Sequence, residues 1–333
     1  MNQNKIAIVV LNWNGKKDTL ECLESIRKID YQNFDVIVVD NGSRDDSVKA
    51  IEKEFPEVNV LETGDNLGYA GGNNYGIRYA IRNGADYILL LNNDIIVESQ
   101  LLNSFIQAAH RVPRWGILAA KIFYFSHPNK IWYAGARRIK KTANFMHLGK
   151  GCIDNGKDFN TLTETDYACG CALFLRSSLL QKIGLFDERF FLTYEETDLS
   201  YRARAYGYKC FLVPEAKVWH KISVSFGGEH SPLFIYFLTR NSLLWAEIHL
   251  SLSERIRLYY HTLKEFFYCI CPPKPSFPNF HLRLSDMRYY FKIYKDDLIH
   301  KYTDPVRRAK VWAITDYILR KFGDCSNAVR SLG

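Results

Sequence analysis

Polar residues follow four apolar runs in the first hundred residues, where side chains that bind a ligand could gather. The runs end in Asn12-Trp-Asn14-Gly15, Asp40-Asn-Gly-Ser43, Gly64-Asp-Asn66 and Asn92-Asn93-Asp94. Turns commonly contain Asn, Asp and Gly, which is the structural explanation for any one of these segments. In an open parallel sheet, however, ligands bind beyond the carboxyl ends of the strands. Four polar ends at one edge of a sheet therefore predict a binding cleft.

The elements that would position this cleft can be predicted from the hydrophobic pattern. Residues 6–11, 36–39, 58–61 and 87–91 have the continuous apolar character of buried strands, and amphipathic helical stretches separate them. Repeated strand–helix–strand units indicate an α/β fold with a mostly parallel sheet flanked by helices. Shorter strand-like pieces, including 168–175, follow residue 116, and a helix is expected over about 197–206. From residue 232 the chain becomes helical and rich in aromatic residues.

The composition limits the class of protein. The 333 residues are 47% hydrophobic and 24% charged, which is typical of globular proteins and excludes disordered and fibrous classes. The apolar runs are far shorter than the roughly 20 residues of a membrane span, and the first residues do not form a signal peptide. Eight scattered cysteines without CxxC spacing favour reduced thiols over a zinc site. We therefore expect a cytoplasmic protein.

The net charge of +8 is concentrated in the last hundred residues. Residues 1–232 carry 28 Lys and Arg against 27 Asp and Glu, whereas residues 233–333 carry 16 against 9. The basic residues that interleave with aromatic ones are Arg240, Arg255, Arg257, Lys264, Arg307, Arg308, Lys310, Arg320 and Lys321. Interfacial helices have this mixture, which predicts peripheral contact with the cytoplasmic face of the inner membrane. Packing on the rest of the chain, or on a second subunit in a homodimer, explains the pattern equally well. Nucleic acid is disfavoured as a partner because no recognition motif accompanies the charge.

Two common nucleotide-binding motifs are missing from the sequence. A dinucleotide-binding fold needs G-x-G-x-x-G directly after its first strand, where this chain has Asn14-Gly15. The glycine-rich segment Gly68-Tyr-Ala-Gly71-Gly72 comes much later, and no GxxxxGK[ST] segment exists. These absences exclude the dehydrogenase and P-loop classes.

The polar segments stand in the same order as the landmarks of a known enzyme family. The landmarks are Val10-Leu-Asn-Trp-Asn14, Val38-Val-Asp40-Asn-Gly-Ser43, Asn66-Leu-Gly-Tyr-Ala-Gly-Gly-Asn-Asn74, Leu90-Leu-Asn92-Asn-Asp94, Phe186-Asp-Glu-Arg-Phe-Phe191, Tyr194-Glu-Glu-Thr-Asp198 and Val218-Trp-His220. From about residue 6 to residue 245 the chain resembles the inverting glycosyltransferases of family 2, which have the GT-A fold. It is similar in particular to the rhamnosyltransferase-like branch that builds bacterial surface polysaccharides, also in Thr239-Arg240-Asn241 and in Asp316-Tyr317 with Gly323.

This resemblance implies a division of the chain. A GT-A catalytic domain would cover residues 1–231, with a nucleotide-binding half at 1–115 and an acceptor half at 116–231. The basic, aromatic, helical region would cover residues 232–333.

The resemblance also implies a nucleotide-diphospho-sugar donor, a UDP-sugar or a dTDP-sugar such as dTDP-rhamnose. Asp40 would accept the N3–H of uracil or thymine in a charge-assisted hydrogen bond, or would form an Asx turn before Gly42. The residues expected to bind the nucleotide are Asn12, Asn14, Asp40, Asn66, Gly71 and Asn93. For the glycines, tight packing of a helix on a strand is the alternative.

A metal site is implied at Asn92-Asn93-Asp94, where family members carry Asp-x-Asp. One carboxylate replaces two here, so Asp94 and the donor phosphates would hold Mn²⁺ or Mg²⁺. His220 would add an imidazole ligand, which suits Mn²⁺ better, or would be structural. The missing carboxylate at Asn92 favours an alternative function, a non-catalytic subunit that binds sugar nucleotides or glycans in a polysaccharide assembly.

Glu195 and Glu196 correspond to the acceptor-side pair that supplies the family's general base. A second carboxylate raises the pKa of its neighbour, which helps to remove a hydroxyl proton near neutral pH. Thr193 and Glu196 also have capping-box spacing, and in that case Glu195 would be the base. Asp198 and Arg202, four residues apart in the same helix, have the spacing of an ordinary surface ion pair.

The implied reaction is a single displacement that inverts the anomeric configuration of the sugar. Its acceptor would be a saccharide in bacterial surface polysaccharide synthesis, carried on a lipid. We expect the acceptor surface to include Trp132, Cys169 and Gly170.

Overall fold

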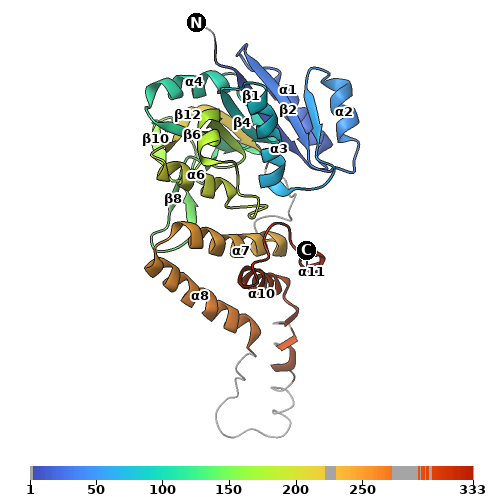
Figure 1. Cartoon of the computed structure of the whole chain (residues 1–333), viewed down its shortest axis with the longest axis vertical. Helices are drawn as coiled ribbons and strands as arrows, with labels where there is room; N and C mark the ends of the chain where they lie inside the picture. The colour runs from blue at the N-terminus through green and yellow to red at the C-terminus, as the bar shows by residue number, and fades with distance from the viewer. Residues whose placement is uncertain are drawn as a thin grey trace. The chain divides into compact units, whose positions relative to one another are not determined.

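The computed structural model describes residues 3–221, 230–271, 292, 294–296, 298–299 and 302–332. The chain divides into two compact units. The first comprises Met1–Lys140 and Asn144–Ser223, and the second comprises Lys141–Ala143 and Val224–Gly333. Every strand in Figure 1 belongs to the first unit, and the second unit is helical. The two units are described separately.

The first unit begins with the predicted alternation of strands and helices. Its elements are β1 (Ile6–Asn12), α1 (Lys16–Ile26), β2 (Phe34–Asp40), α2 (Ser47–Glu54), β3 (Asn59–Glu62), α3 (Gly68–Arg82) and β4 (Tyr87–Asn92). β1 lies between β2 and β4 and is parallel to both, and β3 is parallel to β2. Because such crossovers are right-handed, α1 and α2 cover one face of the sheet and α3 covers the other. The predicted parallel α/β architecture is confirmed.

The sheet continues through the second half of this unit. Its further elements are β5 (Ile95–Val97), α4 (Leu101–Arg111), β6 (Trp115–Tyr124), β7 (His127–Tyr133), β8 (Ala136–Arg138), β9 (Phe145–His147), β10 (Thr163–Thr165), β11 (Ala172–Arg176), α5 (Ser177–Ile183), α6 (Glu195–Ala205) and β12 (Lys209–His220). The strand order is β10-β12-β6-β11-β4-β1-β2-β3, and β11 is antiparallel to both of its neighbours. The predicted nucleotide and acceptor halves therefore share one mixed sheet.

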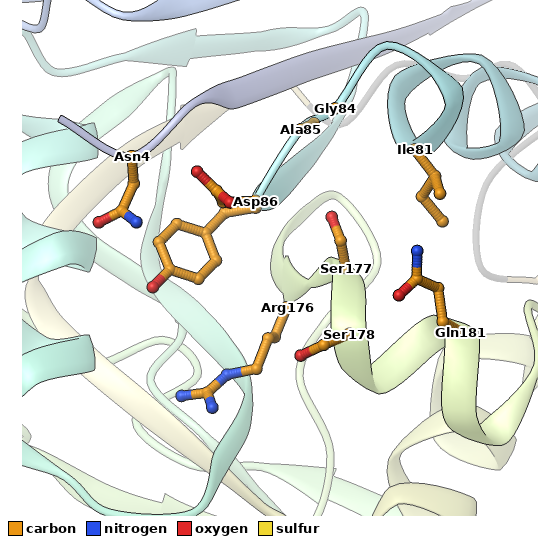
Figure 2. Close-up of a pocket in the computed structure, with 10 residues that line it drawn as sticks. Asn4, Ile81, Gly84, Ala85, Asp86, Arg176, Ser177, Ser178 and Gln181 are labelled. Carbon is orange, nitrogen blue, oxygen red and sulfur yellow. The ribbon is translucent and has the colours of Figure 1, made fainter. Parts of the chain in front are cut away.

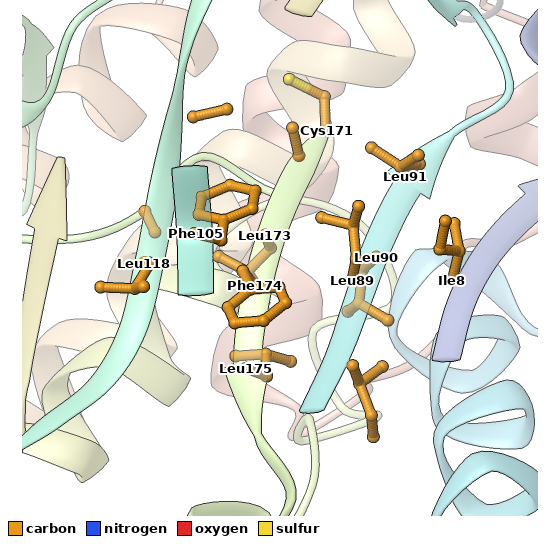
Figure 3. Close-up of a cluster of buried hydrophobic side chains, with 14 of the residues drawn as sticks. Ile8, Leu89, Leu90, Leu91, Phe105, Leu118, Cys171, Leu173, Phe174 and Leu175 are labelled. Carbon is orange, nitrogen blue, oxygen red and sulfur yellow. The ribbon is translucent and has the colours of Figure 1, made fainter. Parts of the chain in front are cut away.

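The core of the sheet joins these two halves. Leu173, Phe174 and Leu175 of β11 are fully buried between β4 and β6 (Figure 3). The ring of Phe174 stacks on that of Phe105 from α4, with centroids 4.8 Å apart and an interplanar angle of 7°. Burial of an aromatic or aliphatic side chain of this size stabilises a fold by about 1.5–3 kcal/mol. The strand ends that carry the polar segments are therefore held on a rigid platform.

The second unit contains α7 (Pro232–His249), α8 (Leu252–Ile270), α10 (Pro305–Ile318) and α11 (Asn327–Arg330). Ser231 caps α7 by accepting a hydrogen bond from the Phe234 N–H, with Pro232 in the first turn. Ser251 and Glu254 form a capping box at the start of α8. Among the described residues, no helix is long and apolar enough to cross a membrane.

Arg240 organises the interior of the second unit. Of the two explanations for the basic and aromatic residues, packing within the chain applies to Arg240, because the residue is fully buried. Its guanidinium donates to the carbonyl of Gly323 at 2.7 Å and to the Tyr236 hydroxyl at 3.3 Å. The Tyr236 hydroxyl in turn donates to Asp316 at 2.7 Å. The Arg240 and Asp316 segments that resemble the rhamnosyltransferase-like branch thus hold α7, α10 and the following turn together.

Candidate active site

The carboxyl ends of the central strands meet at one edge of the sheet, as predicted. Asn12 and Asp40 are register partners at the last positions of β1 and β2. On the other side of β1, Leu11 pairs with Asn92, the last residue of β4. The Asn93–Asp94 turn follows directly.

Asp40 is held by a buried hydrogen-bond network. The Asn12 amide donates to Asp40 Oδ1 at 2.8 Å and to Ser43 Oγ at 3.2 Å, while the Ser43 N–H donates to Asp40 Oδ2 at 3.0 Å. Asp40 thus accepts from the N–H of the third residue on, whereas an Asx turn would use the N–H of the second, Gly42. A carboxylate oxygen can accept two hydrogen bonds, so both oxygens of Asp40 retain capacity for a ligand. Asn12 is fully buried and uses both of its donors on the protein, which gives it a positioning role.

Asn14 and Asn93 brace the two loops beside this network. Asn14 has φ 50°, its N–H donates to Ser43 Oγ at 2.8 Å, and its side-chain oxygen accepts from the Arg44 N–H at 2.8 Å. The Asn93 amide donates to Thr19 Oγ1 at 3.0 Å and to Asn12 Oδ1 at 3.2 Å. Asn14 and Asn93 therefore contact the Asp40 network through protein hydrogen bonds.

Asn41 fixes the start of α3, and the sequence reasoning missed it. Its amide donates to Asn66 Oδ1 at 3.2 Å and to the Gly68 carbonyl at 3.1 Å, and its oxygen accepts from the Leu67 N–H at 3.0 Å. Its place directly after Asp40 in a polar segment was the available signal. A Cβ on Gly71 would lie 2.7 Å from Leu67 Cβ, so close packing accounts for this glycine.

Asp94 and His220 lie side by side across the β5–β12 pairing. Ile95 is the register partner of His220, and His220 Nε2 lies 3.2 Å from Asp94 Oδ2. Both side chains are buried, and His220 Nδ1 has no hydrogen-bond partner among the described residues. The Trp132 ring meets the imidazole edge-on, with centroids 4.9 Å apart. The pair offers one oxygen and one nitrogen ligand, and the part of the chain that the structure describes contains no cluster of three or more His, Cys, Asp or Glu.

The two glutamates occupy the first turn of α6, after a strained loop. The alternative role of Thr193 and Glu196 as a capping box is wrong, because α6 begins at Glu195 and Tyr194 is its N-cap residue. Thr193 and Tyr194 have φ of 66° and 72°, so this backbone is left-handed at two residues without glycine. Such residues cost of order 1–3 kcal/mol each and are common at functional sites. The surrounding fold therefore enforces the position of both carboxylates.

Burial raises the pKa of both carboxyl groups. It raises the pKa of Glu196 to about 7. Burial, and after it the charge of Glu196, raise the pKa of Glu195 well above its usual range. Neither Glu195 Oε2 nor Glu196 Oε2 has a hydrogen-bond partner among the residues described here. With a pKa of about 7, Glu196 can exchange a proton near neutral pH.

Cys171 lies within electrostatic reach of both predicted centres. Burial and Cys169 raise the pKa of Cys171 most, and the charges of Asp94 and Glu196 add to them. The Cys169 and Cys171 sulfur atoms are 3.5 Å apart in a segment that precedes β11, so the strand predicted from residue 168 in fact starts at 172. The metal, base and acceptor residues of the sequence prediction thus meet around this segment.

Tyr69 is a second residue that the sequence reasoning missed. Its hydroxyl donates to the carbonyl of Gly170, which ties the start of α3 to the segment around Cys169 and Cys171. Burial raises the pKa of Tyr69 most, followed by the charges of Glu195 and Glu196. Its position inside the glycine-rich landmark was the signal in the sequence.

Asp198 and Arg202 do not form the predicted surface pair. Asp198 is buried and accepts from Arg202 Nε at 2.7 Å. The Arg202 guanidinium also donates to the carbonyls of Ile183 at 2.8 Å and Leu185 at 2.6 Å. Because a buried carboxylate needs a partner, the arginine is held inward and fastens the loop after α5 to α6.

A cavity of about 440 Å³ lies elsewhere, at the amino ends of β1 and β4 (Figure 2). Its polar lining includes Asn4, Asp86, Arg176 and Ser177. None of the predicted site residues contributes to it. The predicted cleft at the carboxyl ends is thus separate from this cavity.

The fold is that of a GT-A glycosyltransferase. A mannosyltransferase from Pyrobaculum calidifontis in complex with GDP-Man and Mn²⁺ aligns with TM-score 0.55 and 14% identity, covering 96% of this chain and 88% of that one. GalNAc-T7 with UDP, GalNAc and Mn²⁺ aligns with TM-score 0.61 and 15% identity, covering 88% of this chain and 55% of that one.

The chain belongs to glycosyl transferase family 2, whose model matches residues 7–182. It is 27% identical over 286 residues to the N-acetylglucosaminyl-diphospho-decaprenol L-rhamnosyltransferase of Mycobacterium tuberculosis, covering 78% of this chain and 92% of the relative. It is 28% identical over 272 residues to the dTDP-rhamnosyl transferase RfbF of Shigella flexneri, covering 77% and 85%. The predicted family and its rhamnosyltransferase-like character are confirmed.

Proposed function

We propose that the chain transfers a sugar, with inversion, from a UDP- or dTDP-sugar to a saccharide acceptor carried on a lipid. The observation that carries the proposal is the position of Asp94 and Glu196, whose charges both act on buried Cys171. One carboxylate is paired with an imidazole, and the other has a pKa of about 7. A ligand for a cation and a base for a hydroxyl group are thus available in one site.

The donor would be read by Asp40. A uracil or thymine N3–H can donate to its carboxylate, whose position Asn12 and Ser43 fix. Adenine has no ring N–H on the corresponding edge, and guanine carries its N1–H on a larger two-ring base, so we expect a preference for pyrimidine nucleotides. The likeness to RfbF, a dTDP-rhamnosyl transferase, supports dTDP-rhamnose, and the likeness to the decaprenol-dependent enzyme supports a lipid-linked acceptor.

Asp94 and His220 would hold Mn²⁺ or Mg²⁺ together with phosphate oxygens of the donor. Their donor atoms fit such an ion, because a carboxylate oxygen lies 3.2 Å from an imidazole nitrogen and both groups are buried. A mixed oxygen and nitrogen set suits Mn²⁺ better than Mg²⁺. When bound, the cation would neutralise charge on the leaving nucleoside diphosphate. With two protein ligands, we expect weak metal binding until the nucleotide is present.

Glu196 would act as the general base. As the acceptor hydroxyl oxygen attacks the anomeric carbon, its proton would pass to Glu196, and the bond from that carbon to the phosphate oxygen would break on the opposite face. The pKa of about 7 favours Glu196 over Glu195, whose pKa is raised well above its usual range, as the proton acceptor. Trp132, Cys169 and Gly170 would line the acceptor side.

Isothermal calorimetry with UDP, dTDP, GDP and ADP, each with and without Mn²⁺, tests the donor and metal assignments. We expect pyrimidine diphosphates to bind with Mn²⁺ and Asp94→Asn to abolish the metal dependence. Asp158→Asn, which changes an exposed carboxylate, is the matched control. Purine preference or metal-independent binding would overturn the assignments. Nucleotide binding with neither donor hydrolysis nor transfer would favour the non-catalytic subunit.

A further inference from the structure

One face of α8 presents a continuous apolar stripe to solvent. The stripe consists of Leu252, Ile256, Tyr260, Leu263, Phe267 and Ile270, whose exposed fractions lie between 37% and 66%. Their spacing of three and four residues places all six on one side of the helix. Single exposed apolar residues are common, but a stripe along a helix of 19 residues marks an interaction surface.

The opposite face of α8 is already occupied within its own unit. The Tyr259 and Tyr317 hydroxyls are hydrogen-bonded at 2.8 Å, and Glu265 lies 3.4 Å from Lys310 of α10. Cys269 is buried on the same side. At 100° per residue Glu265 and Cys269 lie on the far side of the helix from the stripe, and Tyr259 lies at the edge of the stripe, so α8 is anchored to α10 with its apolar stripe outward.

Exposed cations run along one border of the stripe. At helical spacing, Arg257 and Lys264 lie next to the stripe residues on the side away from Tyr259. The Lys264 ammonium lies 4.4 Å from the centroid of the Tyr260 ring. Neither Arg257 nor Lys264 forms an ion pair among the described residues, and the two acids of α8 are engaged elsewhere, Glu254 in the capping box and Glu265 with Lys310. The surface therefore combines an apolar strip with uncompensated positive charge.

We propose that α8 is an interfacial helix that binds the surface of an anionic lipid bilayer. Its stripe would enter the boundary between headgroups and acyl chains, and Arg257 and Lys264 would contact lipid phosphates. The charge decides between partners, because a cationic border complements anionic lipid and not a second copy of the same surface. Binding of α8 to a bilayer would bring the chain close to a lipid-linked acceptor. In that respect the inference rests on the proposed function.

Sedimentation of the full chain with lipid vesicles tests this inference without any sugar substrate. We expect binding to phosphatidylglycerol-containing vesicles, weaker binding to pure phosphatidylcholine, and loss of binding with added salt. One variant combines Ile256→Ser, Leu263→Ser and Phe267→Ser, and a second combines Arg257→Glu and Lys264→Glu. Each should weaken binding by at least about tenfold, since each lipid-facing cation and each buried methylene contributes to the affinity.

Matched controls change exposed residues of the first unit. Ile139→Ser, Met146→Ser and Ile153→Ser remove comparable apolar surface, and Lys53→Glu with Lys157→Glu reverses two charges; both should bind vesicles as the wild type does. Circular dichroism checks that the α8 variants are folded. The proposal would be overturned if the wild-type protein did not sediment with anionic vesicles, or if the α8 variants bound them with the same affinity as the wild type.

Two further outcomes distinguish lipid binding by α8 from a subunit interface and from the proposed transferase function. A lipid-free dimer that the stripe variant converts to a monomer, without vesicle binding by the wild type, would make the stripe a subunit interface and refute the lipid assignment. Vesicle binding without nucleotide binding would refute the proposed function and leave the membrane inference standing.

Discussion

Replacement of Glu196 by glutamine tests both the chemistry and the electrostatics of the site. The change keeps the size of the side chain and removes its ability to accept a proton. Because Glu196 is assigned as general base, we expect kcat to fall by about 10²–10⁴-fold. Nucleotide binding measured by calorimetry should remain, since Asp40 and Asp94 are unchanged.

The pH dependence of the wild type follows from the same carboxyl group. Burial raises the pKa of Glu196 to about 7, so kcat/KM should rise with pH and level off above that value. At a pH about 1.5 units below the pKa, roughly 3% of the base is ionised, and the rate should be about 30-fold below its plateau. The measurement is transfer with a soluble acceptor analogue across a buffered pH series.

The same shift predicts a change in stability with a definite sign. The pKa of Glu196 is about 7 in the folded chain against an ordinary value of 4.5, so the folded state binds this proton more tightly than the unfolded state. Ionisation of Glu196 therefore lowers the free energy of unfolding. The loss is absent below pH 4.5, grows as the pH rises, and is complete above pH 7. At 1.36 kcal/mol per unit, and with solvent screening of a partly exposed group, Glu196→Gln should gain about 2–3 kcal/mol at pH 8. Urea unfolding at pH 4.5 and pH 8 measures it.

Two further variants are needed: Glu195→Gln tests the alternative base, and Glu164→Gln is the surface control. Glu164→Gln changes a surface carboxylate that pairs with Lys209 and should alter neither the pH profile nor the rate. If the acid limb persisted in Glu196→Gln and disappeared in Glu195→Gln, the base would be Glu195. If no variant gained stability at high pH, the burial argument would be refuted.

Three further changes probe the elements that hold the site. Asp40→Ala should lower pyrimidine nucleotide affinity by about tenfold or more in calorimetry, because it removes a charge-assisted acceptor and leaves the buried Asn12 amide with a lost partner. Arg202→Met should reduce the free energy of urea unfolding by about 3 kcal/mol, since it strands buried Asp198 without its cation, and adding Asp198→Asn should restore part of that loss. Gly76→Ala should lower the unfolding free energy by about 1–3 kcal/mol in the same assay, because a Cβ there would lie 2.5 Å from a valine of β1; an unchanged midpoint would mean that α3 can move outward.

Local pattern was sufficient for the first part of the fold. The uninterrupted apolar run of β1 can satisfy burial only as a central strand, and helices occupy the amphipathic stretches expected between the strands, as α3 does between β3 and β4. Parallel strands must place their carboxyl ends at one edge, so the gathering of Asn12, Asp40 and Asn92 followed from chain order alone. Strand and helix formation depends mainly on residues that are close together in the chain, so the hydrophobic pattern of the sequence is enough to predict it.

Charged residues with distant partners could not be placed in this way. Arg240 and Asp198 are charged, and a charged residue in a hydrophobic pattern is normally predicted to lie at the surface. Their burial depends on carbonyl, hydroxyl and guanidinium groups that the chain supplies from other segments, such as Gly323 for Arg240. The same limit applies to the start of α6, where Thr193 and Glu196 have capping-box spacing but the left-handed turn removes Thr193 from the cap.

The sequence by itself determined which residue types are available and the order of the strands that carry them, because periodicity and turn chemistry are local. Tertiary structure alone decided that Asp94 and Glu196 both lie within electrostatic reach of Cys171, and that burial raises the pKa of Glu196 to about 7. Desolvation and charge–charge interactions depend on everything packed around a group in space. Tyr69 of α3 and Cys171 before β11 both lie within electrostatic reach of Glu196, and no single stretch of residues contains all three.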